Sequence, residues 1–433
     1  MSAPRERPPA VAMAEEFLGS PRFVSALTTA SIGVGVLSFA LRRTIGWPGL
    51  IAALVVLVVL AAGSAYARRS AIEWRGLLPI SLIVFLGWAC LSLLWSHYRW
   101  ASVGGLAYLG GFTALALYIA LMRGTIQVVR SFGDVLRFVL ALSLAIEIIS
   151  GALIDSPITF LDVLGRLPEG GPIQGVEGAR NALGILAVMA LVTFGIEYRT
   201  KSVDRPLAYG SAILAGVVLL LTRSPLAYGA LVIAVVAAAT LYGLRRMRPE
   251  RRRIWQFALL GTVAVVAVAA WAARAPIVQL FSATGDLTYR LDVWYRVWPL
   301  ISLNPLEGWG WIGTWRDDID PFVLFRGLSD RTESSASNAY LDVWFQLGLV
   351  GLAIFVGMVA LALTRSWLLA SRQRSVVFAW PALILVVLVT TALAESSMLV
   401  EFGWLTFVVC LVKAAEQLSW RNALAVNEPA EES

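Results

Sequence analysis

The amino-acid sequence predicts an all-α membrane protein, and three observations lead to that prediction. The 433 residues are 58% hydrophobic and only 15% charged, whereas an average soluble protein has roughly 25% charged residues. Apolar runs of about 20 residues, the length that crosses the hydrocarbon core of a bilayer, recur along the chain. Arginines gather in alternate connections between those runs. These features predict a polytopic helix bundle and exclude a set of soluble domains, because too little polar surface remains to cover them.

About twelve apolar runs are long enough to span the membrane. They lie near residues 23–41, 45–66, 77–95, 102–121, 135–153, 182–197, 207–222, 225–242, 255–273, 342–364, 378–394 and 397–413. The two runs on either side of Leu221-Thr-Arg-Ser-Pro225 are too long together for one crossing, so the polar residues between them predict a tight turn.

The positions of the arginines predict which connections face the cytoplasm, because Lys and Arg concentrate in cytoplasmic loops. With the N-terminus inside, the basic segment Arg245–Arg253 and the other arginine-rich connections are cytoplasmic, and so are both termini. The net charge of +7 then mainly sets the topology and does not indicate nucleic-acid binding. Residues 1–19 lack a contiguous apolar region with a cleavage site, so we expect a cytosolic tail there and not a signal peptide.

The spans and connections divide the chain into five expected regions of a multi-pass plasma-membrane protein. These are a cytosolic tail at 1–22, about nine spans within 23–273, an extracytoplasmic catalytic loop at 274–341, about three spans within 342–413 and a second cytosolic tail at 414–433. Two outer connections, Ile154–Asn181 and Ala275–Leu341, exceed the length of about 12–15 residues beyond which loops are usually functional or disordered. The second holds too many aromatic residues to be disordered.

Within the longer outer loop, apolar residues recur at spacings of three and four, which places them on one face of a helix. These residues are Leu287, Leu291, Trp294, Trp298 and Ile301. An interfacial helix on the outer leaflet would show this pattern, with Arg290 and Arg296 reaching toward the headgroups. A helix that only caps the bundle would show it too, and the composition leaves both interpretations open.

The residue inventory excludes several kinds of site. The sequence holds one histidine, His97, so a metal site built on several histidines is impossible. Cys90 and Cys410 both lie inside apolar runs, which excludes a disulfide framework or a zinc ribbon. Glu147 lies within an apolar run, where an ionisable group either serves function, here by holding an arginine in position, or has a structural partner.

Three motifs occur in order along the second half of the chain: Gly308-Trp-Gly-Trp-Ile-Gly313, Ser337-Asn-Ala-Tyr-Leu-Asp342 and Gly348-Leu-Val-Gly-Leu352. Together they resemble the signature of the superfamily of O-antigen ligases, O-antigen polymerases and exopolysaccharide polymerases. Further matches follow the expected order: Leu91-Ser-Leu-Leu-Trp-Ser96, Gly178-Ala-Arg-Asn-Ala-Leu-Gly184, Leu221-Thr-Arg-Ser224, Tyr289-Arg-Leu-Asp-Val-Trp294 and Ala394-Glu-Ser-Ser397.

The resemblance implies a reaction at the outer leaflet. Members of this group transfer a glycan from a polyprenyl pyrophosphate carrier to an acceptor hydroxyl without a metal ion or another cofactor. Guanidinium groups suit this task because they bind diphosphate in a bidentate manner and stabilise charge on the leaving oxygen. Arg180, Arg223 and Arg290 match motif positions where the family tends to carry arginine. The implied partners are therefore the lipid-linked glycan donor, a glycan or glycolipid acceptor and the bilayer, with no nucleic acid.

The resemblance also implies the roles of individual residues. The expected catalytic residues are Arg223, Arg290, Glu333, Ser337 and Asn338. The expected substrate-binding residues are Glu177, Arg180, Trp294, Arg296, Tyr340 and Glu395. For each arginine a simpler interpretation stays open, because a basic residue at the end of a span also serves as a turn residue or as a contact to lipid headgroups.

Ser337 departs from the family pattern, because many members carry a histidine at that motif position. Serine has no useful basicity near neutral pH and cannot simply replace a general base. Three explanations remain: a carboxylate such as Glu333 or Glu177 takes the proton, the leaving group needs little base assistance, or the protein has lost activity. His97 is a further candidate in another loop.

Two rival function classes are a transporter or flippase of lipid-linked glycans and a non-catalytic assembly partner. Transporters tend to show repeated halves and charges near the membrane midplane. Here no internal repeat is apparent, and the candidate charges gather at one predicted membrane face, which favours an enzyme. The sequence does not separate a ligase from a polymerase, since the two share the donor chemistry and differ in the acceptor.

Overall fold

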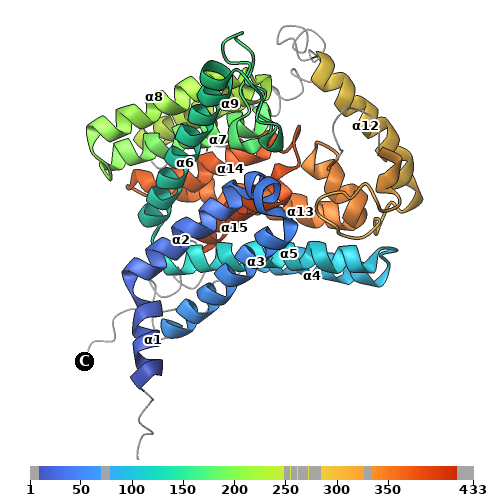
Figure 1. The fold of residues 1–433 in the computed structure, drawn as a ribbon. Coiled ribbons are helices and arrows are strands. Elements are labelled where there is room, and N and C mark those ends of the chain that lie inside the picture. Colours follow the sequence, from blue (N-terminus) through green and yellow to red (C-terminus); the bar gives the residue numbers. More distant parts are fainter. Residues whose placement is uncertain are drawn as a thin grey trace, which may run out of the picture. The chain divides into compact units, whose positions relative to one another are not determined.

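The structure is a computed structural model that describes residues 9–69, 79–247, 284–325 and 334–416, with the isolated positions 254, 261 and 272. It is all-helical, with 81% helix (Figure 1). The described residues form no strand, and a single antiparallel bridge joins Ile158 and Val163. The predicted all-α class is confirmed.

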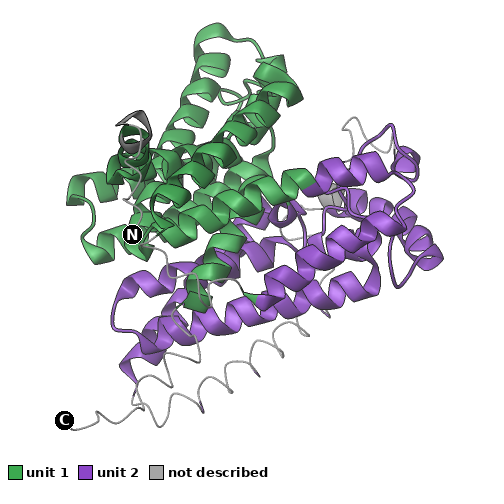
Figure 2. Cartoon of the chain, turned by 90° about the horizontal axis from the view of Figure 1, so that it is seen from below, with its two compact units in different colours: residues 1–79, 107–223, 400–433 green, residues 80–106, 224–399 purple. Residues whose placement is uncertain are grey.

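The chain divides into two compact units, each assembled from segments that are distant in sequence (Figure 2). Unit 1 comprises residues 1–79, 107–223 and 400–433, and unit 2 comprises residues 80–106 and 224–399. The helix α5 belongs to both, because its first residues lie in unit 2 and the remainder in unit 1.

The elements of unit 1 are mostly long helices joined by short connections. They are α1 Pro9–Gly19, α2 Pro21–Val36, α3 Ser38–Ala67, α5 Arg99–Met122, α6 Thr125–Ile148, the π-helical turn η3 Ile149–Ile154, the 3-10 turns η4 Thr159–Leu161 and η5 Gly175–Glu177, α7 Arg180–Thr200, α8 Arg205–Thr222 and α15 Glu401–Glu416.

Unit 2 contains two early elements and the elements that follow α8, except α15. They are α4 Ile80–Leu91, η2 Ser92–Leu94, α9 Pro225–Arg246, α12 Thr284–Leu303, η6 Phe322–Phe325, α13 Ala339–Arg372, η7 Val376–Phe378, α14 Ala379–Thr391 and η8 Ser397–Leu399.

Seven helical segments within the described ranges are long and apolar enough to cross a membrane. They are Ser38–Ala67, Arg99–Met122, Thr125–Ile154, Arg180–Thr200, Arg205–Thr222, Pro225–Arg246 and Ala339–Arg372. Two shorter apolar segments, Ile80–Leu94 and Val376–Thr391, overlap the predicted spans 77–95 and 378–394, whereas the predicted span 255–273 lies almost entirely outside the described residues. The number twelve therefore stays a prediction.

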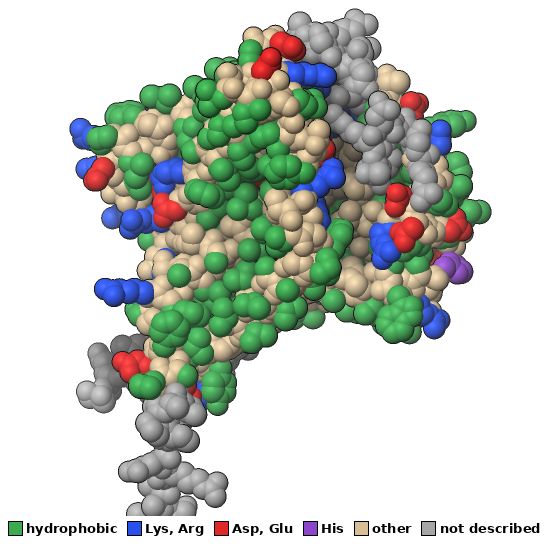
Figure 3. All heavy atoms as spheres, viewed as in Figure 1, with side chains coloured by type: hydrophobic (Ala, Val, Ile, Leu, Met, Phe, Trp, Pro, Cys, Tyr) green, Lys and Arg blue, Asp and Glu red, His purple; other side chains and the backbone are tan. Residues whose placement is uncertain are grey.

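The outward faces of these helices are apolar, as a lipid solvent requires. Val55, Val56 and Val59 of α3 are each more than half exposed, and Val235 and Val236 of α9 are as well. Hydrophobic side chains are spread over the visible face of the molecule in Figure 3. Side chains of this kind would be unfavourable against water in such number, and they support a membrane protein.

The two longest helices each bend at a glycine. Gly46 of α3 has φ 73° and ψ 176°, and Gly348 of α13 has φ 69° and ψ −175°. In α3 the helix resumes with Pro48 in its first turn, where the missing N–H costs no hydrogen bond. The bend at Gly46 falls at the expected boundary between the runs 23–41 and 45–66.

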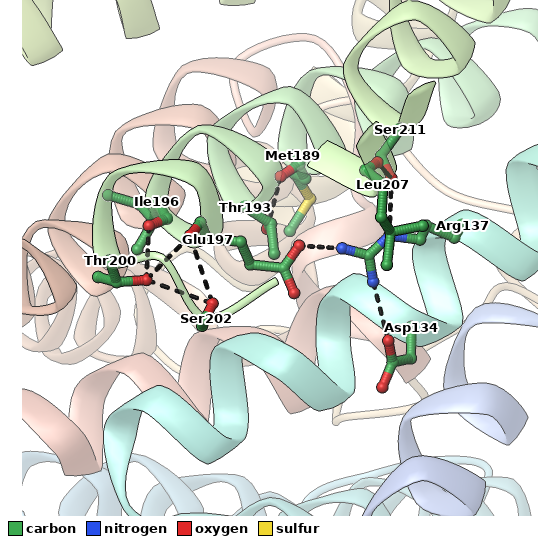
Figure 4. Close-up of polar contacts among 10 residues, drawn as sticks. All are labelled: Asp134, Arg137, Met189, Thr193, Ile196, Glu197, Thr200, Ser202, Leu207 and Ser211. Carbon is green, nitrogen blue, oxygen red and sulfur yellow. Dashed lines mark hydrogen bonds and ion pairs between the residues drawn. The ribbon is translucent and has the colours of Figure 1, made fainter. Parts of the chain in front are cut away.

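A buried ionic network joins three helices of unit 1 (Figure 4). The Arg137 guanidinium of α6 pairs with the fully buried Glu197 of α7, and its Nη1 lies 2.8 Å from Asp134 Oδ1. Its Nε donates to Ser211 Oγ of α8 at 2.8 Å. The predicted topology places this network at the cytoplasmic ends of the helices, away from the expected site, and we interpret it as a structural clamp.

The helix α12 packs through a face that differs from the predicted one. Val293, Val297 and Ile301 are at most 3% exposed and contact the aromatic core of unit 2, whereas Leu291 is 48% and Trp298 is 55% exposed. Leu291 and Trp298 of the predicted stripe therefore do not pack on this core, and the interfacial position of the stripe stays a prediction. The spacing of four between Val293, Val297 and Ile301 defines the buried face. The ring of Trp298 instead packs edge-on against the half-buried Trp344, with 5.4 Å between the ring centroids.

Candidate functional site

The glycines of the Gly308–Gly313 motif shape a loop that inserts into the bend of α13. Gly308, Gly310 and Gly313 all have positive φ, at 71°, 101° and 76°, which favours residues without a Cβ. The N–H groups of Trp309 and Gly310 donate to the carbonyl oxygens of Phe345 and Gln346 at 3.1 and 2.8 Å. These carbonyls are available because the bend at Gly348 interrupts the helical hydrogen-bond pattern.

Two buried polar residues of α13 fix the same loop, and the sequence analysis did not single them out. Gln346 Oε1 accepts from the N–H groups of Ile312 and Gly313, both at 2.9 Å. Asp342 Oδ1 accepts from Trp315 Nε1 at 2.7 Å. The signal that could have found them is a pair of polar residues four apart in an apolar helix, since buried polar groups need partners.

The expected residues of unit 2 form one connected group, here called the Arg290 cluster: Arg290, Trp294, Ser337, Asn338 and Glu395. Arg290 Nε donates to the carbonyl oxygen of Ala394, and Nη2 lies 3.0 Å from Glu395 Oε1. Trp294 Nε1 donates to the carbonyl oxygen of Ala336 at 2.9 Å. The cluster thereby joins α12 to the start of α13 and to the connection after α14.

Asn338 is the N-cap of α13, and its contacts give it a positioning role. Its Oδ1 accepts from the N–H groups of Tyr340 and Leu341 at 3.0 and 3.1 Å, and its Nδ2 donates to Leu393 O at 3.1 Å. Its own N–H donates to Ser396 Oγ. The preceding Ser337 has φ 50°, a strained conformation for a residue with a Cβ. Backbone strain of this kind is typical of functional sites.

Tyr340, Arg296 and Glu333 are the three remaining residues of the expected site in the second half of the chain. Tyr340 is half-buried, and its hydroxyl lies 3.5 Å from Val389 O. Arg296 is exposed, with Nη1 3.3 Å from Leu324 O. Glu333 lies outside the described residues, so its predicted role stays a prediction.

His97 lines an open depression of about 640 Å³ together with Tyr98, Arg99, Trp100 and Arg316. Burial raises the pKa of the Tyr98 phenol, whose hydroxyl donates to Gly310 O at 3.0 Å. Ser337 is not among the residues that line the depression. The geometry therefore gives His97 no link to the motif position that Ser337 occupies.

In unit 1 the loop Ile154–Asn181, which is predicted to face outward, is anchored on α6. Glu147 Oε1 accepts from the N–H groups of Gln174 and Gly175, at 2.7 and 2.9 Å. Of the two interpretations of Glu147, the structural partner is the one observed, and the backbone supplies it. The carboxylate compensates two loop donors that would otherwise be buried without an acceptor.

Glu177 lies in this loop, and the charges of Arg42 of α3 and Glu401 of α15 act on it. Neither of these residues, nor Tyr108 of α5, was predicted from the sequence. The Arg42 guanidinium pairs with Glu401, and Tyr108 Oη donates to Glu401 Oε1 at 2.8 Å. Glu177 Oε1 is buried without a hydrogen-bond partner. Burial and the Glu401 carboxylate raise the pKa of Glu177 to about 8, against the opposing effect of Arg42. A charged residue at the end of an apolar run or within it, such as Arg42 or Glu401, is the sequence signal that could have marked these residues as candidates.

Arg223 is the C-cap of α8 and has a left-handed conformation, with φ 46°. The next residue, Ser224, is the N-cap of α9. The predicted tight turn is present there. Among the described residues, the exposed Arg223 guanidinium makes no ion pair. A Cβ added at Gly170 would lie 3.3 Å from Arg223 Nη2, so the guanidinium lies against the loop that carries Glu177. Arg180 is half-buried as the first residue of α7.

A comparison with known protein families matches one segment of the chain. Residues 210–356 match a family model described as O-Antigen ligase. This match supports membership of the O-antigen ligase family. No curated protein matches the chain. The O-antigen ligase segment includes Arg223, Arg290, Ser337 and Asn338.

The O-antigen ligase domain supports a role in glycan transfer during polysaccharide assembly. The apolar helices and this domain together support a membrane protein. The family implies a lipid-linked glycan donor and a glycan acceptor in the membrane. Of the residues discussed above, Glu177, Arg180 and Glu395 lie outside the matched segment, as do Arg42, Tyr108 and Glu401.

Proposed function

We propose that this protein transfers a glycan from a polyprenyl pyrophosphate to an acceptor hydroxyl at the outer face of the membrane. The O-antigen ligase domain supports the reaction class. The observation that carries the donor site is Arg223, whose exposed guanidinium makes no ion pair with a described carboxylate. An unneutralised cation at the end of a span is available to an anionic ligand.

The proposed step displaces pyrophosphate from the glycan. The acceptor oxygen forms a bond to the anomeric carbon, and the bond from that carbon to the phosphate oxygen breaks, so that the polyprenyl pyrophosphate leaves with the electron pair. A guanidinium at the leaving oxygen stabilises the developing negative charge. The resemblance implies that arginine performs this task without a metal ion.

The predicted topology supports an outer site, with both termini in the cytoplasm. In that orientation the turn at Arg223 and the loop 154–181 face outward. The resemblance gives Arg180 a supporting role in donor binding and gives Arg290 a catalytic role, and each is proposed here as a separate hypothesis.

The test is deletion of the gene followed by complementation and analysis of the lipid-linked glycan pool. We expect Arg223→Ala to reduce glycan output by about 10²-fold or more, as for loss of a charge-stabilising group, with Arg223→Lys only partly active. The control is Arg130→Ala, because Arg130 is exposed on α6 in a region predicted to be cytoplasmic.

The accumulated intermediate identifies the reaction. Single lipid-linked repeats indicate a polymerase, and long chains that remain on the carrier indicate a ligase. Intermediates that stay on the cytoplasmic side indicate a flippase and would contradict the proposal. Unchanged glycan output with Arg223→Ala would also contradict it and favour a non-catalytic assembly partner.

A further inference from the structure

Four ionisable side chains of unit 1 come together from four separate elements. Arg42 comes from α3, Tyr108 from α5, Glu177 from η5 and Glu401 from the first position of α15. Glu401 is the centre of the group, because it pairs with Arg42 and accepts a hydrogen bond from Tyr108 at 2.8 Å. The Arg42 guanidinium also lies 5.0 Å from the centroid of the Trp47 ring.

Glu177 is the member of this group that a purely structural role does not explain. Glu147, in the same unit, uses its carboxylate to accept two backbone N–H groups of the loop. Glu197 leaves one oxygen unpaired, but the other oxygen binds Arg137. Glu177 has a buried oxygen without a partner, and Arg42 beside it is already paired with Glu401. An unsatisfied buried carboxyl oxygen is unfavourable for folding and is retained where it serves another purpose.

The exposure of Glu177 is suited to contact with a substrate. The residue as a whole is only half-buried, although Oε1 is covered. The loop around it is close-packed: a Cβ added at Gly178 would lie 2.1 Å from the Phe39 ring. The neighbouring Arg43 is paired with Asp162 at 2.6 Å, which ties the loop to α3. The carboxyl is thus held at a fixed position at the predicted outer end of the unit.

The backbone of Glu401 adds a second, independent indication. Its φ of 49° is left-handed, a conformation that is unfavourable for a residue with a Cβ by about 1–3 kcal/mol. This strained first residue of α15 carries the carboxylate that contacts both Arg42 and Tyr108. Strain retained at the centre of a polar cluster is typical of functional sites.

We propose that Glu177 accepts the proton of the acceptor hydroxyl, and that Arg42, Tyr108 and Glu401 are positioning residues that fix the charge around it. This inference rests on the proposed function. As the acceptor oxygen bonds to the anomeric carbon, its proton moves to the Glu177 carboxylate, and the electron pair of the broken bond leaves with pyrophosphate. Glu177 thereby supplies the basicity that Ser337 lacks.

The electrostatics of the group support this assignment. Burial and the adjacent Glu401 carboxylate raise the pKa of Glu177 to about 8, and Arg42 opposes that effect. A base whose pKa lies near the working pH combines a useful deprotonated fraction with strong proton affinity. The charged and titratable groups that face Glu177 are Glu401 from α15 and Arg42 from α3, with Tyr108 of α5 bonded to Glu401.

The experiment uses the purified full-length protein in proteoliposomes, with lipid-linked glycan extracted from the deletion strain as donor and membranes of that strain as acceptor. Transfer is measured from pH 6 to 9. Binding of radiolabelled polyprenyl pyrophosphate is measured in parallel. The variants are Glu177→Gln, Glu177→Asp and Tyr108→Phe, and the control is Asp155→Asn, an exposed carboxylate at the start of the same loop.

We expect Glu177→Gln to reduce transfer by about 10²–10⁴-fold, as for loss of a general base, with polyprenyl pyrophosphate binding changed less than twofold. Wild-type transfer should rise about tenfold per pH unit below pH 8, because the rate follows the deprotonated fraction. Tyr108→Phe should move the midpoint of this profile without abolishing transfer. Asp155→Asn should behave as wild type.

The inference is overturned if Glu177→Gln keeps transfer within twofold of wild type, or if the pH profile is the same in Tyr108→Phe and wild type. Should Glu177→Gln not fold, Glu177→Asp and Tyr108→Phe decide the question through the profile alone. Loss of transfer in Arg223→Ala with full activity in Glu177→Gln would refute only this inference. Full activity in Arg223→Ala would refute the proposed function as well.

Discussion

At the scale of single residues, the hydrogen-bond partners of a side chain distinguish a positioning residue from a candidate for the chemical step. Asn338 and Glu177 both belong to the expected site, but Asn338 uses its amide to cap α13 and to bind Leu393 O. Glu177 keeps a buried oxygen without a partner. Both residues have a polar side chain near a motif, and residue type alone gives them equal standing. Their hydrogen bonds distinguish them, because the side chain of Asn338 is fully used in positioning and that of Glu177 is not. The mechanistic tests are therefore directed to Glu177 and Arg223.

Replacing Glu177 by Gln should change how stability depends on pH. The pKa of about 8 in the folded state lies above the value of about 4.3 for an unfolded Glu. Between these values the folded state binds the proton more tightly, so wild-type stability falls as pH rises, by up to about 1.4 kcal/mol per unit. Glu177→Gln stays neutral in both states. The thermal midpoint of Glu177→Gln in detergent, relative to that of wild type, should therefore increase from pH 5 to pH 8. If the two midpoints depend on pH in the same way, the pKa of Glu177 is not raised in the folded state.

At the scale of elements, the bend of α13 explains two of the motifs together. Gly348 interrupts the helix, and the Gly308–Gly313 loop binds the carbonyl oxygens that this bend exposes. The predicted spans near 207–222 and 225–242 correspond to the helices α8 and α9, which are long and apolar enough to cross a membrane, because an apolar run between polar ends specifies a helix well. The buried face of α12 was not predicted, because both aromatic and aliphatic residues occur around that helix and only packing selects among them.

Substitution of Gly348 by Ala should destabilise the protein strongly. An alanine Cβ there would lie 2.0 Å from Leu306 O, and φ 69° adds strain of about 1–3 kcal/mol. The matched control is Gly357→Ala in the same helix, where no atom lies within 4 Å of the added Cβ. We expect Gly357→Ala to raise stability by about 0.5–1 kcal/mol, as for Ala in place of Gly in a helix. Thermal midpoints in detergent check both, and equal effects would contradict the proposed role of the bend.

At the scale of the whole molecule, a small number of charged residues both sets the predicted topology and supplies the candidate site and the buried ion pairs. The sequence has 35 Lys and Arg against 28 Asp and Glu, and most of the basic residues lie in connections or terminal tails that are predicted to be cytoplasmic. The remaining charges lie at the other ends of the spans or are buried in pairs such as Arg137 with Glu197. The predicted orientation of the protein rests on this charge distribution, and the proposed outer site depends on it.

Cysteine labelling tests that orientation. In a background with Cys90→Ala and Cys410→Ala, single cysteines at the exposed positions Glu169, Lys201 and Asp318 report on one side each. We expect a membrane-impermeant maleimide to label Glu169→Cys and Asp318→Cys in intact cells, and Lys201→Cys only after disruption, because positively charged loops stay inside. The opposite pattern would place the proposed site in the cytoplasm and remove the basis for a lipid-linked donor at the outer leaflet.

The amino-acid sequence was enough to predict the all-α class, many helix positions, the resemblance to O-antigen ligases and the candidate residues Arg223 and Arg290. These predictions rest on hydrophobic length and local motifs, which are properties of short segments. Only the packing of the helices shows that Glu147 holds a loop, that Asn338 caps a helix, and that Arg42 and Glu401 lie near Glu177, with Tyr108 bonded to Glu401. Arg42 and Glu401 are 359 positions apart, and no local pattern records such a pairing. Contacts of that range arise from packing, which depends on all the helices of a unit at once.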